Sequence, residues 1–385
     1  MGIDAIFSAH NWAVVPFHFW SLCFLVLGCM TGSFLNVCIH RMPLGMSIIT
    51  PRSHCPHCQY SIPWYLNIPL VTWLALGGRC KNCGAPISLR YFIVELLTGV
   101  AFLGCWLAFG NASHPLPSMP LALVYAVFLA GLIVATFIDF EHLIIPDEIT
   151  IGGMAVGFIA SFFIPALHGA GGPDVGMRRG FVGAVAGAGM VYAILRLGKW
   201  LFGRQRLKLP VGTRIVFGET ALHLPDKDIP YEELFYRQSD VIVLQAETVE
   251  LVDRGYQNVE VRLSPGMLEI GEEKFNPDDV PCMEAVSAEV VLPREAMGLG
   301  DVKFMGAIGA FIGWQGVLFT LTVSSLIGAV YGATMVLLRR QEWSGRLYFG
   351  PFIALAAAIW IFAGWPLVAG YQHLTESLMA SLLPH

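Results

Sequence analysis

Residues 120–140 read PLALVYAVFLAGLIVATFIDF, a run without a charged side chain until Asp139 near its end. A helix needs about 20 mostly apolar residues to cross the hydrocarbon core of a bilayer. The run therefore predicts a transmembrane helix that carries a carboxylate at one end. The whole chain has a similar character, because 55% of its 385 residues are hydrophobic and only 13% are charged, whereas soluble domains contain about 25% charged residues.

Seven other segments are apolar over much of the length of a membrane-spanning helix. The first is expected to be retained, because no Lys or Arg precedes it and it lacks a small-x-small cleavage site. The sixth is short and runs almost directly into the seventh. The predicted fold class is a polytopic α-helical membrane protein with about eight transmembrane helices, at residues 16–39, 91–110, 120–140, 149–166, 179–202, 303–314, 315–338 and 350–371.

The positions of Lys and Arg predict the orientation of these helices. The loop at residues 41–90 holds five basic residues and no acidic one, and loops rich in Lys and Arg stay in the cytoplasm. Eight crossings counted from this loop place both termini outside. Residues 139–148, 203–302 and 339–349 are then expected to face the cytoplasm.

A polar insertion separates the fifth and sixth predicted helices. Residues 204–296 contain 18 of the 28 acidic residues but only 10 of the 23 basic ones, so the insertion is acidic and the remainder is basic. Its segments RIVFGETALHL (214–224), DVIVLQAETVELV (240–252) and NVEVRLSPGMLEI (258–270) alternate apolar and polar residues between turn-forming residues. This alternation is typical of half-buried strands, so we predict a mostly β cytoplasmic domain.

These features divide the chain into five parts. They are a first transmembrane helix at 1–40, a cytoplasmic Cys-bearing loop at 41–90, helices two to five with Asp139 at 91–203, the β-rich insertion at 204–296, and helices six to eight with Asp301 at 297–385.

Four of the nine cysteines form two Cys-x-x-Cys pairs in the basic loop. The pairs are Cys55 with Cys58 and Cys80 with Cys83, and 21 residues separate them. This spacing is typical of a zinc ribbon, in which four thiolates surround one metal ion. The alternative is that the thiols are unliganded or redox-active. The remaining cysteines show no ligand pattern. Four lie in apolar helices and are expected to pack as small hydrophobic residues; they are Cys23, Cys29, Cys38 and Cys105. Cys282 lies in the insertion without a partner motif.

Two aspartates are the candidate catalytic residues. Asp139 ends the third predicted helix, and Asp301 follows Gly298-Leu299-Gly300 immediately before the sixth. Ionisable residues at membrane helices are expensive to keep and mark functional sites. Two adjacent carboxylates can share a proton, so that the ionised one activates water while the protonated one polarises a carbonyl. The alternative is that both aspartates only cap helix ends.

The residues near the two aspartates are expected to have supporting or structural roles. Gly298 and Gly300 would let a substrate backbone approach Asp301 closely. Lys303 either follows the positive-inside bias or tunes Asp301. Asp147 is expected to cap the helix that begins near residue 149. Glu141 and Glu148 are expected to be solvated, and Glu95 to pair with a basic residue of the loop.

The motifs around these residues resemble the type IV prepilin peptidases, which are bifunctional leader peptidases and N-methyltransferases of the bacterial cytoplasmic membrane. The resemblance covers every part of the chain except residues 204 to about 292. The motifs that carry it are Gly32–Val37, the four cysteines, Trp64–Pro69, Arg79, Gly84–Ser88, Tyr91, Val94–Gly99, Ile138-Asp139, Ile145–Asp147, Thr150, Glu295–Gly298, Gly300–Lys303 and Phe349–Phe352.

The resemblance implies that Asp139 and Asp301 are the catalytic aspartates of a membrane-embedded aspartic endopeptidase. Its substrates would be type IV prepilins or pseudopilins, each with a short basic leader before a hydrophobic helix. The new N-terminal amine would then be methylated with S-adenosylmethionine as donor, an activity associated with the Cys loop. The residues that bind this cofactor stay unknown, because no Gly-rich methyltransferase loop is present.

The resemblance also implies a location in the bacterial inner membrane, with the active site facing the cytoplasm and lipid around the helices. The insertion at 204–296 is a departure from the family pattern. It would gate the site, receive a pilus or secretion assembly protein, or be inert; no nucleic-acid partner is expected. Two further hypotheses stand beside the main one: a peptidase without methylation, and a non-enzymatic zinc-ribbon membrane scaffold.

Overall fold

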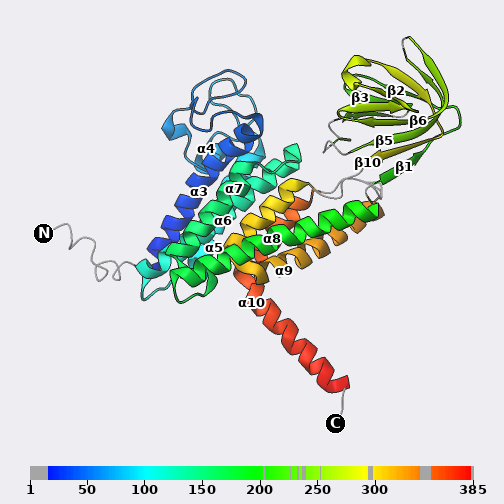
Figure 1. Cartoon of the computed structure of the whole chain (residues 1–385). Helices are drawn as coiled ribbons and strands as arrows, with labels where there is room; N and C mark the ends of the chain where they lie inside the picture. The colour runs from blue at the N-terminus through cyan, green and yellow to red at the C-terminus, as the bar shows by residue number, and fades with distance from the viewer. Residues whose placement is uncertain are drawn as a thin grey trace. The chain divides into compact units, whose positions relative to one another are not determined.

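The structure is a computed structural model of the whole chain (Figure 1). It falls into two compact units, Met1–Val191 with Leu299–His385, and Tyr192–Gly298. The residues that it describes are 16–202, 204–225, 227–231, 234–235, 240–251, 253–293, 298–338 and 348–382.

The first unit is built from long apolar helices that lie side by side (Figure 1). Within the described residues, six helices are long and apolar enough to cross a membrane. These six are all of the helices named at the end of this paragraph except α7. At 17 residues α7 lies at the lower limit for a spanning helix. The helices are α3 (Phe17–Arg41), α5 (Leu89–Phe109), α6 (Pro115–His142), α7 (Asp147–Phe163), α8 (Pro173–Phe202), α9 (Leu299–Leu337) and α10 (Phe349–Leu382).

The helix α9 contains the sixth and seventh predicted spans. Its backbone is broken at Gly313, which has φ 70° and ψ 176°. The first part begins beside Ile145 and ends beside His168, which lies between α7 and α8. Further along, Tyr331 contacts Phe352 near the start of α10. The two parts of α9 therefore run in opposite directions, and the structure agrees with about eight crossings.

Small residues allow these helices to approach closely, as the glycine-rich sequence of the membrane segments indicates. Gly183 of α8 and Gly309 of α9 lie backbone to backbone, and a Cβ atom on either one would collide with the other. The helix α8 also begins at Pro173, six residues earlier than the sequence predicts. Proline suits the first turn of a helix, and Asp174 follows it where a negative charge is favoured.

The second unit is an antiparallel β domain, as predicted for the insertion. Its sheet has the strand order β4-β3-β2-β9-β5-β6-β7-β8, and β10 pairs with both β1 and β5. Alternate residues such as Ile242, Leu244 and Ala246 are buried in one apolar core. The strands are β1 (Arg204–Lys208), β2 (Arg214–Phe217), β3 (Ala221–Leu224), β4 (Lys227–Pro230), β5 (Ile242–Glu250), β6 (Gly255–Ser264), β7 (Met267–Ile270), β8 (Glu273–Phe275), β9 (Met283–Val286) and β10 (Glu289–Pro293).

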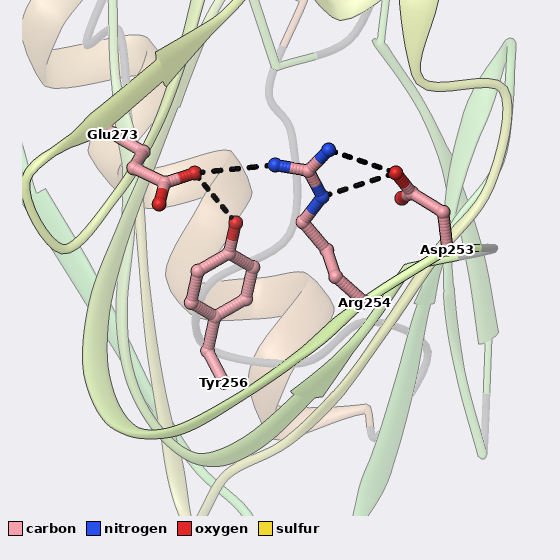
Figure 2. A network of polar contacts seen from close by, with 4 residues as sticks. All are labelled: Asp253, Arg254, Tyr256 and Glu273. Atoms are coloured by element: carbon pink, nitrogen blue, oxygen red, sulfur yellow. Dashed lines mark hydrogen bonds and ion pairs between the residues drawn. The ribbon is translucent and has the colours of Figure 1, made fainter.

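A small polar network joins the β5–β6 turn to the β7–β8 hairpin (Figure 2). The Arg254 guanidinium donates to Asp253 Oδ2 at 2.8 and 3.1 Å and lies 3.5 Å from Glu273 Oε2. The Tyr256 hydroxyl donates to the same Glu273 oxygen at 2.8 Å. The Arg254 side chain lowers the pKa of Asp253 by hydrogen bonding. Because these side chains are exposed, the network contributes little stability.

Candidate active site

Asp139 lies in the last turn of α6, where the chain leaves the helix. Leu143 ends the helix in the left-handed conformation, with φ 56°, and the chain then turns toward Pro146. Only 7% of Asp139 is exposed. Its carboxylate accepts a hydrogen bond from the backbone N–H of Gly350, the second residue of α10. The first N–H groups of a helix have no partner within the helix, so a carboxylate satisfies them well.

Asp301 lies in the first turn of α9. It is the third residue of Leu299–His385, the second of the two segments that form the first unit. A negative charge is favoured at this end of a helix by the unpaired N–H groups. Gly300, which precedes it, faces Ile145, since a Cβ atom on Gly300 would lie 3.7 Å from the Cβ atom of Ile145. The glycine before the aspartate thus packs against the segment that follows Asp139.

Ile145 links the surroundings of the two aspartates. A Cβ atom on Gly350 would lie 3.3 Å from the Ile145 Cδ1 atom and 2.6 Å from the Asp139 Oδ2 atom. Ile145 therefore contacts both the glycine against Asp139 and the glycine beside Asp301. The two predicted site residues come from α6 and α9, 162 positions apart in the numbering. The glycine against Asp139 and the glycine before Asp301 border the same side chain.

Lys303 and Asp147 form an ion pair. The roles expected from the sequence for these two residues do not include this pair. Lys303 Nζ donates to Asp147 Oδ1 at 2.7 Å and to Oδ2 at 2.9 Å, which joins the first turn of α7 to that of α9. The expectation that Asp147 caps a helix near residue 149 is wrong in detail. The helix α7 begins at Asp147 itself, Pro146 occupies the cap position, and the carboxylate is used by Lys303.

Of two other expectations about acidic residues, one is confirmed and one is wrong. Glu141 is exposed to solvent as expected, and its carboxylate also accepts a hydrogen bond from Arg90 at the start of α5. Glu95 is buried and accepts the backbone N–H of Leu70 at 2.7 Å, where a basic side chain was expected. Leu70 has a positive φ of 61°, and this bond holds the strained loop residue against α5.

The four paired cysteines converge in the loop between α3 and α5. Their sulfur atoms all lie within 4.8 Å of one another, and the closest separations are 3.8 Å for Cys55 and Cys83 and 4.0 Å for Cys58 and Cys80. A tetrahedral site with zinc–sulfur bonds of about 2.3 Å has edges of about 3.8 Å. The cysteine arrangement therefore fits a zinc ion.

The two halves of this cluster repeat one backbone pattern. The N–H of Cys55 bonds the carbonyl of Tyr60, and the N–H of Cys80 bonds the carbonyl of Ala85. The residue after each second cysteine, Gln59 or Gly84, has a positive φ. Within residues 42–88, all of which are described, Cys55 is the only buried hydrophobic residue. A loop with so little apolar core gains its folding energy from a metal.

The acidities of these thiols also favour a cation. The Asn82 side chain, followed by the Tyr60 backbone, lowers the pKa of Cys58 to about 6. The backbone hydrogen bond with Ala85 lowers the pKa of Cys83, but desolvation and the neighbouring sulfur atoms together raise it to about 11. Neighbouring thiolates repel one another, so all four ionise together only beside a positive ion. His54 points elsewhere, with its Nδ1 atom 2.9 Å from the Arg52 carbonyl.

Sequence reasoning missed the positions of Gly350 and Ile145 in this site. Both belong to motifs that carry the family resemblance, Phe349–Phe352 and Ile145–Asp147. Nothing in either motif indicates that it contacts the other, since such contacts depend on helix packing. The motif residues Glu295, Ala296 and Met297 and the basic residues Arg339, Arg340 and Arg346 lie outside the described residues.

Comparisons with known proteins give consistent matches. Residues 26–109 match the bacterial peptidase A24 N-terminal domain, and residues 126–218 and 282–333 match the type IV leader peptidase family. Together these matches cover more than half of the chain and both aspartates. Residues 219–281, which form the middle of the β domain, are passed over by the family model.

Individual relatives are proteins named prepilin leader peptidase/N-methyltransferase. The Myxococcus xanthus protein is 41% identical over 195 residues, which cover 47% of this chain and 56% of that protein. The Aeromonas hydrophila protein is 27% identical over 379 residues, covering 91% of this chain and 92% of that protein. The Pseudomonas aeruginosa protein is 26% identical over 89% of this chain and 90% of its own length. No solved structure matches the chain significantly.

Proposed function

The chain belongs to the type IV leader peptidase family, and from this premise we propose that it is a membrane-embedded aspartic endopeptidase. Its substrates are type IV prepilins or pseudopilins, from which it removes the leader. Asp139 and Asp301 are the catalytic pair. The observation that supports this assignment is that Gly350, which lies against Asp139, and Gly300, which precedes Asp301, both border Ile145.

The two carboxylates divide the work of peptide hydrolysis. One is ionised and removes a proton from a water molecule, whose oxygen attacks the scissile carbonyl carbon. The other is protonated and donates a hydrogen bond to the carbonyl oxygen as negative charge develops there. A proton then passes to the leaving amine, so one water is consumed and a carboxylic acid and an amine are released. The N–H of Gly350 orients the Asp139 carboxylate for its part in this sequence.

Conservative substitutions test the catalytic pair. Asp139→Asn and Asp301→Asn keep the side-chain shape but cannot share a proton, so each is expected to abolish cleavage of a prepilin in reconstituted membranes. Asp228→Asn is the matched control, because it makes the same change at an exposed carboxylate of the β domain that pairs with His223. Full activity in Asp301→Asn would refute the assignment, provided that the melting temperature of each variant stays near the wild-type value.

We further propose that the chain methylates the new N-terminal amine with S-adenosylmethionine as donor. The names of the relatives support this second activity. The Cys55, Cys58, Cys80 and Cys83 loop holds zinc and serves this step as a folded element. Mass spectrometry of processed pilin tests it: a mass increase of one methyl group is expected, and an unmodified N-terminus would leave a peptidase alone.

The location that fits this function is the bacterial inner membrane, with the aspartates at the cytoplasmic side. The basic loop at 41–90 supports this orientation, since it is rich in Lys and Arg and joins α3 to α5. Thiol labelling of Cys83, which is exposed, distinguishes the two faces in right-side-out and inverted vesicles. Labelling is expected in inverted vesicles treated with a chelator. Labelling confined to right-side-out vesicles would reverse the topology.

A further inference from the structure

An apolar groove runs along the first unit between α3, α6, α7 and the first part of α9. Its volume is about 570 Å³, which lies within the range of about 300–1,000 Å³ typical of ligand sites. Its walls carry large apolar side chains, among them Leu27, Phe34, Val127 and Phe311. Leu27, Phe34 and Val127 are also among the exposed hydrophobic residues of the chain, so this surface is open to a partner.

The groove extends along the membrane and ends near the aspartates. Its lining on this side runs along α3 from Leu27 to Met42, the residue that follows the helix, a distance of about 22 Å along a helix. This is most of the bilayer core, which is about 30 Å thick. At the other helices its lining reaches Val134, five residues before Asp139, and Phe304, three residues after Asp301. An elongated apolar occupant would therefore present one end to the catalytic pair.

Two glycines leave room for a helix in this groove. Gly131 of α6 and Gly152 of α7 both line it, and a Cβ atom on either would have no other atom within 4 Å. Glycines on the open face of a membrane helix let a second helix backbone approach closely. Such close approach suits a polypeptide helix better than a lipid chain, because helix packing gains van der Waals contacts along both backbones.

One charged residue lies at the mouth of the groove. Among the described residues that line it, Glu148 is the only ionisable acid or base with a full charge, and it directly follows Asp147 at the start of α7. An acidic group at this end complements a cationic segment that precedes an apolar helix. A prepilin has this order of charge and hydrophobicity.

We propose that this groove binds the apolar helix of the substrate, with Gly131 and Gly152 against the helix backbone and Glu148 beside the basic leader. The inference rests on the proposed peptidase function. It adds a binding surface that is separate from the catalytic aspartates and that selects substrates by their membrane helix.

Filling the groove tests the proposal. Gly131→Leu and Gly152→Leu add side chains to open space, so they are compatible with the fold. Their effect is measured on two substrates: a full prepilin in lipid nanodiscs, and a short soluble peptide that ends shortly after the cleavage site. A KM increase of about tenfold is expected for the prepilin, with unchanged cleavage of the peptide. Gly189→Leu on α8 is the matched control, because it also points into open space but does not line the groove.

A cross-linking experiment gives a readout that does not depend on turnover. With p-benzoylphenylalanine in place of Gly152, in an Asp301→Asn background, a covalent adduct with the prepilin is expected. The same group in place of Gly189 should give none. Equal adducts from both positions would overturn the proposal.

The kinetic outcomes separate this inference from the function on which it rests. Wild-type kinetics of both groove variants on the prepilin would show that the groove does not bind the substrate helix, and would overturn the inference alone. Equal losses on the prepilin and the peptide would overturn it too, because the groove would then shape the catalytic pair. Failure of the wild-type protein to cleave either substrate would instead refute the peptidase function itself.

Discussion

The contact between Gly350 and Asp139 makes a sharp prediction about the site. A Cβ atom added by Gly350→Ala would lie 2.6 Å from Asp139 Oδ2 and 3.2 Å from its Cγ atom. Ordinary contacts of this kind are about 3.5–4 Å, so the carboxylate or the start of α10 must move by about 1 Å. The side chain beside the added atom is the proposed catalytic carboxylate of Asp139, and the Ile145 Cδ1 atom lies 3.3 Å from the same added atom.

A displacement of about 1 Å at a catalytic group costs on the order of 100-fold in rate. This corresponds to about 2.7 kcal/mol of transition-state stabilisation. We therefore expect Gly350→Ala to lower kcat for prepilin cleavage about 100-fold while KM changes little, because the groove proposed to bind the substrate helix is not lined by Gly350. The assay is cleavage of a prepilin in nanodiscs, followed by gel mobility at several substrate concentrations.

The matched control is Gly104→Ala on α5. Its Cβ atom would make an ordinary contact of 3.5 Å with Phe362 of α10, so its activity is expected to stay within about twofold of wild type. Both variants should keep the wild-type melting temperature to within a few degrees and retain their zinc. Wild-type kcat in Gly350→Ala would refute the idea that the start of α10 positions Asp139.

Three other predictions concern the metal, a half-buried histidine and the β domain. Purified protein should contain about one zinc ion per chain, and Cys55→Ser with Cys80→Ser should abolish it; metal analysis that finds none in the wild type contradicts the ribbon. Burial, with Arg179 nearby, lowers the pKa of His168 to about 4, so the unfolded state takes up a proton first as pH falls from about 6.5. Stability should therefore decrease between pH 6.5 and 4 by at most about 3 kcal/mol, reduced by partial solvation, and His168→Gln should remove that decrease in thermal melts. Arg254→Ala should leave the denaturation midpoint of the β domain nearly unchanged, because exposed ion pairs contribute little stability; a large decrease in a denaturant titration would show that the network in Figure 2 is structurally important.

Local patterns in the sequence predict the elements of this fold well. Residues 120–140 predict a transmembrane helix, and the alternating segment 240–252 predicts a strand, because hydrophobic periodicity reflects which faces are buried. The doubled Cys-x-x-Cys pattern predicts the convergence of four sulfur atoms, since each pair forms its own turn. These features depend on residues close together in the chain.

Contacts between distant segments are harder to predict. The pair of Lys303 with Asp147 joins residues 156 positions apart, and the bond from Gly350 to Asp139 joins residues 211 apart. Both depend on how α6, α7, α9 and α10 pack, and sequence periodicity gives the buried face of a helix without its neighbour. The reversal at Gly313 is a similar case: the sequence predicts two spans there, but only the backbone conformation shows where the first ends.

The pairing of β1 with β10 has a consequence for how this chain could have arisen. Arg204 lies opposite Pro293, so the strand that enters the β domain and the strand that leaves it are antiparallel neighbours. Opposite residues in such a pair are only about 5 Å apart. A module whose two ends meet can be spliced into a loop, or lost from it, without stretching the host chain on either side. Insertion or loss of such a module between α8 and α9 would then leave the helices on both sides intact. The family model itself passes over only residues 219–281, which hold β3 to β8, and matches the strands on both sides of them.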